Sequence, residues 1–352
     1  MGKKVLLGMS GGVDSSVSAV LLIEKGYEVI GCTMRLTKGS NTDACGNESR
    51  AEGAKKICDE LGIPHYTFDF TAEFSDKVIS NFIDEYRLCR TPNPCIVCNK
   101  YLKFGKMFEK WRELGCDYMS TGHYARTEYS EKYGGVVLKK ARNLQKDQTY
   151  FLYNMTPEIA ERLIFPLEEF ESKDRVRQVA AEHGMAVATK PDSEDACFIP
   201  DGDYKKFLEE NSDIKPMPGD AVLTDGTIIG RHEGLYRYTI GQRKGLGIAY
   251  KHPIYVVGFD ADANRLIMGA ESDLYSDRFT AENVNWILKN PPTEAFKCKV
   301  KTRYSQREYD CTVFPNGAEC KVVFDRPQKS VTPGQSAVFY DGDICLGGGA
   351  IK

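Results

Sequence analysis

The sequence predicts a doubly wound α/β domain with a parallel sheet, followed by a small β-rich domain and a C-terminal antiparallel β-barrel. Short apolar runs alternate with stretches of helical periodicity as far as about residue 212, which is typical of a parallel sheet covered by helices. From about residue 216 this periodicity ends, and glycine, proline and β-branched residues take over. We therefore divide the chain into residues 1–212, 213–276 and 277–352.

Four apolar runs of the first domain are expected to form strands of the parallel sheet: residues 3–7, 28–36, 65–70 and 117–124. Apolar residues at helical spacing predict helices that end at Gly26, at Leu61 and near Ile83, a helix over 102–111, and one that Ser172 caps and that ends near Gly184. Residues 126–140 are expected to form a hairpin around Gly134-Gly135.

The second half of the chain carries turn signals and basic residues. Pro216-Met217-Pro218-Gly219 marks a boundary, residues 238–247 are basic and glycine-rich, and residues 254–268 are expected to form a hairpin. Short alternating segments after residue 279 predict a small barrel. Along one of its strands Lys297, Lys299, Lys301 and Arg303 alternate, which is compatible with either a solvated face or a phosphate-binding surface.

Composition excludes several classes of protein. The chain has 352 residues, of which 41% are hydrophobic and 28% charged, as in ordinary globular proteins. No apolar run approaches the roughly 20 residues needed to span a membrane, and the first strand begins directly after the N-terminus, so we expect a cytoplasmic protein without a membrane anchor. The net charge of −3 restricts any nucleic-acid site to a local basic patch. Twelve cysteines in such a chain favour metal or catalytic roles.

The segment from Gly8 to Ser16 joins the first strand to the first helix through a glycine-rich turn. Such a turn directs backbone N–H groups and the positive end of a helix at an anion. The segment lacks the Gly-Lys-Ser/Thr ending of a Walker A loop and is not a GxGxxG motif. It is therefore either a phosphate-binding loop of another kind or an ordinary βα turn.

Two further segments place cysteines where packing alone does not explain them. Residues 90–100 contain two prolines and a Cys95-x-x-Cys98 pair, and we expect a loop that leads into a helix whose dipole would stabilise a thiolate. Residues 190–200 form a second expected loop, acidic and polar, with Cys197 on a small apolar tip. Met34 ends the second strand, beside the glycine-rich turn, where it is placed either to contact a nucleotide base or to fill the core.

Six motifs in order make the chain resemble the bacterial tRNA-specific 2-thiouridylase (MnmA) family of the ATP-pyrophosphatase superfamily, with its adenine nucleotide α-hydrolase-like fold. They are Gly8–Ser15, Thr91-Pro92-Asn93-Pro94 with Cys98-Asn99, Thr121–Tyr124, Lys146-Asp147-Gln148, Asp195–Ile199 and Tyr238–Gly245. The resemblance covers essentially the whole chain. It implies an enzyme that adenylates the C2 oxygen of the wobble uridine in tRNAs for Lys, Glu and Gln and then replaces that oxygen with sulfur.

The resemblance also implies which residues act. ATP, with Mg²⁺, would bind to the positions that match the nucleotide site of the family: Gly8, Met9, Ser10, Gly11, Gly12, Val13, Asp14, Ser15, Met34 and Gly122. The tRNA would bind to the positions that match its contacts in the family: Asn93, Pro94, Cys95, Lys146, Asp147, Gln148, Arg303 and Tyr304. The middle and C-terminal domains would also bind tRNA phosphates, through residues 237–247 and the lysine-rich strand.

By the same resemblance, Cys197 matches the persulfide carrier. Cys98 matches the second catalytic cysteine, which would attack to release the outer sulfur and leave a Cys98–Cys197 disulfide. The sulfur donor would be a cysteine desulfurase or a sulfur-relay protein. That the two cysteines meet in space is implied by the resemblance and not by their spacing.

One position departs from the family. Cys95 stands where the family commonly has an aspartate that is interpreted as a general acid or base. With Cys98 and Cys197 it makes three thiols, enough to hold a [4Fe–4S] cluster with one open iron. The persulfide route and a cluster route are therefore both open, and a structural Zn²⁺ lacks an evident fourth ligand.

Two other kinds of protein remain as alternatives. The glycine-rich turn also fits another ATP-pyrophosphatase, such as an amidotransferase-type synthetase, but such enzymes need neither paired loop cysteines nor a basic β-domain. The second alternative is a non-catalytic RNA-binding protein with a vestigial nucleotide fold, against which Ser10, Asp14, Ser15 and both cysteines argue because all are present. Release of AMP that depends on tRNA would separate the three.

Overall fold

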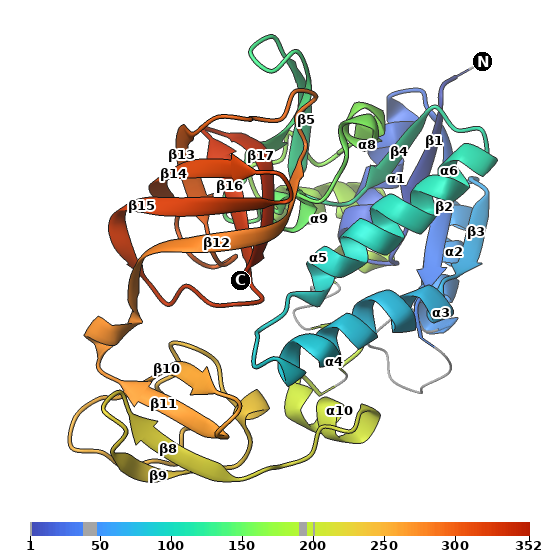
Figure 1. Ribbon diagram of the computed structural model, residues 1–352. Helices are drawn as coiled ribbons and strands as arrows, with labels where there is room; N and C mark the ends of the chain where they lie inside the picture. Colours follow the sequence, from blue (N-terminus) through green and yellow to red (C-terminus); the bar gives the residue numbers. More distant parts are fainter. Residues whose placement is uncertain (1, 38–47, 190–195, 200) are drawn as a thin grey trace.

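The structure is a computed structural model that describes residues 2–37, 48–189, 196–199 and 201–352. It contains a parallel sheet with its helices, a small four-stranded sheet and a C-terminal barrel (Figure 1). The barrel lies beside the parallel sheet, and the small sheet lies below the barrel in this view. Within the described residues, none of the helices combines the length and apolarity that a membrane crossing requires.

The parallel sheet has the order β3-β2-β1-β4-β7. Its strands are β1 (Lys4–Gly8), β2 (Glu28–Arg35), β3 (His65–Asp69), β4 (Tyr118–Thr121) and β7 (Leu163–Ile164). Val5 and Leu7 of β1 pack into one core cluster and Leu6 into another, because successive side chains of a strand point to opposite faces. Both faces are covered, so the predicted doubly wound sheet is confirmed.

Helices on the two faces account for this burial. The elements around the sheet are α1 (Val13–Glu24), α2 (Glu48–Glu60), α3 (Thr71–Phe74), the π-helical η1 (Ser75–Ile79), α4 (Ser80–Arg87), α5 (Pro94–Cys98), the π-helical η2 (Asn99–Lys106), α6 (Met107–Glu113), α7 (Thr149–Leu152), α8 (Pro157–Arg162), α9 (Lys173–Glu182), the 3-10 helix η3 (Ala186–Thr189) and α10 (Tyr204–Asn211). Ser172 caps α9 as predicted, since its hydroxyl accepts a hydrogen bond from the Arg175 N–H.

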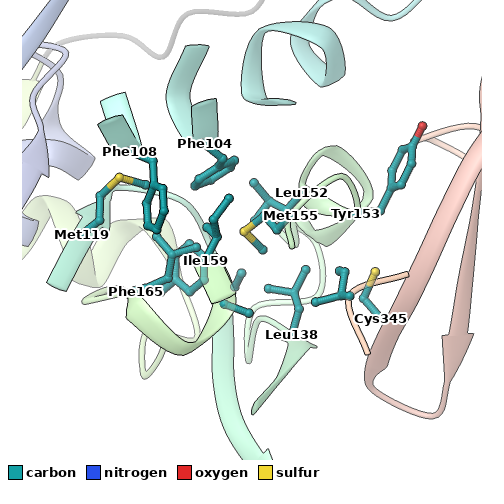
Figure 2. Close-up of a cluster of buried hydrophobic side chains, with 14 of the residues drawn as sticks. Phe104, Phe108, Met119, Leu138, Leu152, Tyr153, Met155, Ile159, Phe165 and Cys345 are labelled. Carbon is teal, nitrogen blue, oxygen red and sulfur yellow. The ribbon is translucent and has the colours of Figure 1, made fainter. Parts of the chain in front are cut away.

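A buried cluster fixes the helix that follows the CxxC segment. Figure 2 shows Phe104 and Phe108 of η2 and α6 directed toward Leu152, Met155 and Ile159. The same cluster continues to Leu138 and to Cys345 of the C-terminal barrel. The first domain and the barrel therefore share one hydrophobic core, and η2 is anchored at their contact.

The small sheet has the order β10-β11-β8-β9. Its strands are β8 (Gly219–Leu223), β9 (Ile228–His232), β10 (Tyr255–Asp260) and β11 (Arg265–Gly269), with the 3-10 helices η4 (Leu235–Arg237) and η5 (Glu271–Leu274) beside them. The antiparallel pair β10–β11 confirms the predicted hairpin. The basic segment 238–247 contains no regular strand and lies between η4 and β10.

The barrel runs in the order β12-β15-β14-β13-β16-β17 and closes through a pairing of β12 with β17. Its strands are β12 (Tyr275–Trp286), β13 (Phe296–Lys301), β14 (Tyr309–Asn316), β15 (Glu319–Lys329), β16 (Ser336–Asp341) and β17 (Ile344–Ile351). The predicted hairpin of the first domain, β5 (Ala125–Ser130) with β6 (Gly135–Lys140), extends this sheet, because Leu138 pairs with Cys345.

A barrel segment also holds the chain that leads to the CxxC pair. The Thr91 N–H donates to the Pro333 carbonyl at 2.9 Å, and Gln335 Nε2 donates to the Thr91 carbonyl at 2.7 Å. Arg90 pairs with Glu282 of β12 at 3.0 Å. The chain just before α5 is thus hydrogen-bonded to the barrel.

Candidate active site

A cavity of about 260 Å³ lies at the carboxyl ends of β1 and β2. It brings together residues expected at the nucleotide and residues of the two cysteine segments. They are Met9, Ser10, Met34, Pro94, Cys95, Cys98, Lys103 and Cys197. The two cysteines that are far apart in the sequence, Cys98 and Cys197, line the same space as the glycine-rich turn. Ligands bind at this edge of open parallel sheets.

The turn itself begins at Gly8, the last residue of β1, and leads to Gly12, the N-cap of α1. Gly11 adopts a φ of +71°, which favours glycine. Ser15 Oγ accepts a hydrogen bond from the Ser10 N–H at 3.2 Å and donates to the Gly12 carbonyl at 3.0 Å. The turn is therefore held in shape by its own serines, with the N-terminus of α1 directed at its mouth.

Asp14 makes polar contacts that join the turn to other parts of the domain. It accepts hydrogen bonds from the Tyr124 hydroxyl at 2.7 Å and from Lys173 Nζ at 2.6 Å. Lys173 opens α9 and is mostly buried, with 13% of its side chain exposed. Lys173 was not among the residues predicted for the site, although the Ser172 cap indicated that α9 begins there.

Gly122 lies directly against the turn. A Cβ at this position would approach the backbone carbon of Asp14 and the backbone nitrogen of Ser15, both at 3.0 Å. A glycine at this position thus has a steric basis, because it lets the end of β4 lie close to the start of α1.

We expect Gly122→Ala to weaken ATP-dependent AMP formation roughly tenfold, since small misplacements of binding groups are costly in catalysis. The new methyl group would push the Asp14–Ser15 backbone by a few tenths of an ångström. Steady-state AMP release measures the effect. Gly53→Ala is the matched control, because a Cβ there meets no atom within 4 Å and helix α2 gains a better helix former. Equal activity in the two variants would contradict a role for this close contact.

The CxxC segment is helical, which corrects the predicted loop. Pro94 occupies the first turn of α5, where proline is favourable because no N–H is needed there, and Asn93 is the N-cap. Cys98 is the last residue of α5 and is buried. The helix continues without a break through η2 and α6 to Glu113, so Cys98 lies in its second turn, close to the N-terminal end whose dipole favours an anion.

The electrostatics of both thiols follow from burial. Burial raises the pKa of Cys98 to about 11, while the charge of Lys103 acts in the opposite direction. Cys95 is exposed at the surface, yet the surrounding protein still desolvates its thiol and raises its pKa, again opposed by Lys103. Burial therefore opposes the predicted thiolate at Cys98, and among the titratable neighbours of Cys98 it is Lys103 that favours the anion.

Cys197 lies in a turn, as predicted, and is half-buried. The neighbouring Phe198 anchors this turn, with its ring 5.6 Å from that of Phe74 and 5.1 Å from that of Phe207. Cys197 is disulfide-bonded, whereas Cys98 carries a free thiol, so the implied Cys98–Cys197 pairing is not the one in the structure. Asp195 of the same motif lies outside the described residues.

The described residues do not fit an iron–sulfur cluster. No set of three or more His, Cys, Asp or Glu side chains in the described part of the chain is arranged to hold a metal ion. Cys95, Cys98 and Cys197 share a cavity, but the sulfur of Cys197 is engaged in its disulfide. The cluster alternative therefore finds no ligand set here.

The implied tRNA residues Lys146, Asp147 and Gln148 lie between β6 and α7, and their environments differ. Lys146 is exposed. Asp147 is buried, accepts hydrogen bonds from the Ala141 N–H at 3.0 Å and the Thr149 hydroxyl at 2.7 Å, and has a pKa raised by burial. Gln148 Oε1 accepts from the Tyr124 N–H at 2.9 Å. Asp147 and Gln148 thus shape the segment, and Lys146 faces solvent.

Arg303 and Tyr304 also differ from each other. Arg303 is half-buried and donates to the Ile240 carbonyl at 2.9 Å and to the Thr332 hydroxyl, so it joins the barrel to the basic segment 238–247. Tyr304 is 37% exposed, and its ring lies 4.5 Å from that of Phe151. On β13, Lys297 and Lys299 are exposed on the face opposite Val300, as the alternation predicted, whereas Lys301 is half-buried and Arg303 lies beyond the end of the strand.

Three comparisons place these features among known proteins. Residues 3–201 match the family described as "tRNA methyl transferase HUP domain", residues 205–270 its PRC-barrel domain, and residues 276–351 the "Aminomethyltransferase beta-barrel domain". A curated protein of Acetivibrio thermocellus, "tRNA-specific 2-thiouridylase MnmA", is 47% identical, with 99% of each chain covered. One of the same name from Clostridioides difficile is 45% identical, covering 100% of this chain and 99% of that one.

Two solved structures share more distant similarity with the chain. The "U34-tRNA thiolase NcsA from Methanococcus maripaludis with its [4Fe-4S] cluster" has a TM-score of 0.37 at 20% identity, covering 60% of this chain and 68% of that chain. NMN synthetase from Francisella tularensis has a TM-score of 0.32 at 13% identity, covering 61% and 79%.

Proposed function

The chain belongs to the tRNA-specific 2-thiouridylase MnmA family, and from this membership we propose that it is an ATP-dependent tRNA sulfurtransferase that converts uridine in tRNA to 2-thiouridine. One observation carries the proposal beyond the family name. The cavity that holds Cys98 and Cys197 also contains Met9 and Ser10 of the glycine-rich turn and Met34. An activated uridine and its sulfur source therefore have one common site.

The first half of the reaction needs activation, because the C2 oxygen of uridine is a poor leaving group. Transfer of AMP from ATP onto that oxygen releases pyrophosphate and makes the oxygen part of a good leaving group. We place the phosphates at the turn from Gly8 to Ser15, in front of α1. Mg²⁺ would neutralise phosphate charge there, and Asp14 supplies the kind of single carboxylate that such nucleotide-bound ions use.

The second half transfers sulfur. Cys197, once its disulfide has been reduced and the thiol has received sulfur from a donor, carries a persulfide, Cys197–S–SH. The Cys98 thiolate attacks the Sγ of Cys197, the sulfur–sulfur bond breaks, and the outer sulfur leaves as hydrosulfide. Hydrosulfide attacks C2 and displaces AMP, so the uridine gains sulfur. The two cysteines are left as a Cys98–Cys197 disulfide, which a thiol reductant must reopen before the next turnover.

The tRNA substrate and the partners follow from the family resemblance and the exposed basic residues. We propose the wobble uridine of the tRNAs for Lys, Glu and Gln as the target, and the cytoplasm as the place of action. Lys146, Tyr304, Lys297 and Lys299 are the exposed candidates for contacts with the anticodon arm. Asn93, Pro94 and Cys95 lie at the entrance to α5, beside the cavity. A cysteine desulfurase or a relay protein would supply the sulfur.

The persulfide route is tested with protein freed of iron. We expect the metal-free enzyme to thiolate tRNA when given ATP and a sulfur donor. We also expect Cys95→Asp to retain activity within about threefold, because aspartate is common at this position in the family and the site accommodates it. Iron and sulfide analysis of anaerobically purified protein, with thiolation assayed on the same sample, measures both. About four irons per chain with activity lost on chelation would overturn the persulfide route and make Cys95 a ligand.

A further inference from the structure

Lys103 lines the cavity, and its ammonium group forms no ion pair with a carboxylate among the residues that the structure describes. It lies in η2, one turn beyond Cys98, and lines the cavity together with Cys95, Cys98 and Cys197. Its described polar partner is the ring nitrogen Nε2 of His123, at 3.3 Å from Nζ. Across the described part of the chain, no carboxylate pairs with this ammonium.

The His123 ring fixes the position of the ammonium. An ammonium can only donate, so Nε2 of His123 must be the acceptor, and the ring proton is on Nδ1. Nδ1 then donates to the Thr121 hydroxyl, 2.8 Å away, at the end of β4. Burial and the Lys103 charge both hold the pKa of His123 well below its usual range, which keeps the ring neutral and able to accept.

Packing limits the freedom of the same lysine. The next residue, Phe104, is buried in the cluster of Figure 2, which fixes η2 against α7 and β4. Lys103 therefore presents a half-buried positive charge to the cavity from a rigid element. A charge of this kind without a carboxylate partner stabilises an anion beside it.

We infer that Lys103 is a positioning residue whose charge promotes ionisation of the Cys98 thiol to the sulfur nucleophile, and that His123 keeps the ammonium directed into the cavity. The inference rests on the proposed function for its role in turnover. When Cys98 ionises, its proton passes to solvent through the cavity. The titratable groups that act on Cys98 are Lys103 and Cys95, and Lys103 alone favours the anion.

The test is the pH dependence of Cys98 alkylation by iodoacetamide, followed on the Cys98 peptide by mass spectrometry in the full-length protein. Only the thiolate reacts, so the rate rises with pH. Lys103→Gln removes the charge and keeps a hydrogen-bond donor to His123. We expect its profile to move upward by about one pH unit, which makes alkylation at neutral pH about tenfold slower.

Two further variants sharpen the result. Lys103→Arg keeps the charge and should give a profile close to that of the parent protein. Lys106→Gln is the matched control, because Lys106 belongs to the same element but pairs with Glu109 at 3.0 Å. If Lys103→Gln shows no melting transition, His123→Leu takes its place. This variant keeps the Lys103 charge but removes the hydrogen-bond acceptor of the ammonium, and its alkylation profile should also move to higher pH.

An unchanged profile in the folded Lys103→Gln variant would overturn the inference, as would an equal shift in Lys106→Gln. Slower AMP formation with no change in thiol reactivity would assign the lysine to a phosphate instead, which also overturns it. Alkylation requires neither ATP nor tRNA, so it is independent of the proposed function. A parent protein that fails to thiolate tRNA, yet shows the shift between variants, would contradict that function alone.

Discussion

Cys197→Ser should reduce tRNA thiolation by about three orders of magnitude or more, because loss of a covalent carrier removes a whole step of the reaction. Serine is nearly isosteric with cysteine but cannot carry a persulfide sulfur. The Phe198 anchor that places the turn is unchanged by this substitution. The measurement is the 2-thiouridine content of digested tRNA, by mass spectrometry, after incubation with ATP and a sulfur donor.

Binding of ATP and of tRNA to this variant should stay close to that of the parent protein, because neither contact depends on a thiol. Cys298→Ser is the control, since Cys298 is a free, partly exposed cysteine of β13 in the barrel. If Cys197→Ser still thiolates tRNA at a rate comparable to the control, Cys197 is not the sulfur carrier.

Asp14→Asn should reduce AMP formation by roughly a hundredfold, because it removes the negative charge at the phosphate-binding turn and leaves Lys173 without its carboxylate. The amide keeps the size of the side chain and can still accept from the Tyr124 hydroxyl. Pyrophosphate release in the presence of tRNA measures the loss. Binding of tRNA should not change, because Asp14 belongs to the nucleotide side of the cavity.

The matched control lies at the other end of the same helix. Glu24 also forms an ion pair, in which its carboxylate lies 3.2 Å from Nε2 of His183. Its side chain is 55% exposed. Glu24→Gln should leave AMP formation unchanged, because exposed pairs contribute little. A similar loss in both variants would mean that helix α1 as a whole, and not the charge of Asp14, is responsible.

The parallel sheet could be predicted because its strands are apolar on both faces. Val5, Leu6 and Leu7 form a continuous apolar run, which marks a strand buried between two helical layers. The attachment of hairpin β5–β6 to the barrel could not be predicted, since Leu138 and Cys345 are far apart in the sequence. Strand β7 has only two residues and leaves no periodic signal.

The site could be predicted where a sequence motif determines the local backbone conformation. The turn from Gly8 to Ser15 has the expected place and shape, and Met34 lines the expected cavity. The CxxC helix was missed because Pro92 and Pro94 suggested an extended chain, although proline is favourable at the start of a helix. Lys103 was missed because only tertiary structure distinguishes it from Lys106 of the same helix, which pairs with Glu109.

Thr91 connects the barrel to the helix that carries Cys95 and Cys98. This residue hydrogen-bonds to Pro333 and Gln335 of the barrel, three residues before α5 begins at Pro94. When two segments share hydrogen bonds and a hydrophobic core, they unfold locally as one cooperative unit. Amide hydrogen exchange at α5 should therefore follow that of the barrel strands, and a destabilising substitution in the barrel should accelerate both. A destabilising substitution far from the cavity would then reduce sulfur transfer through local unfolding of α5, although it changes no cysteine.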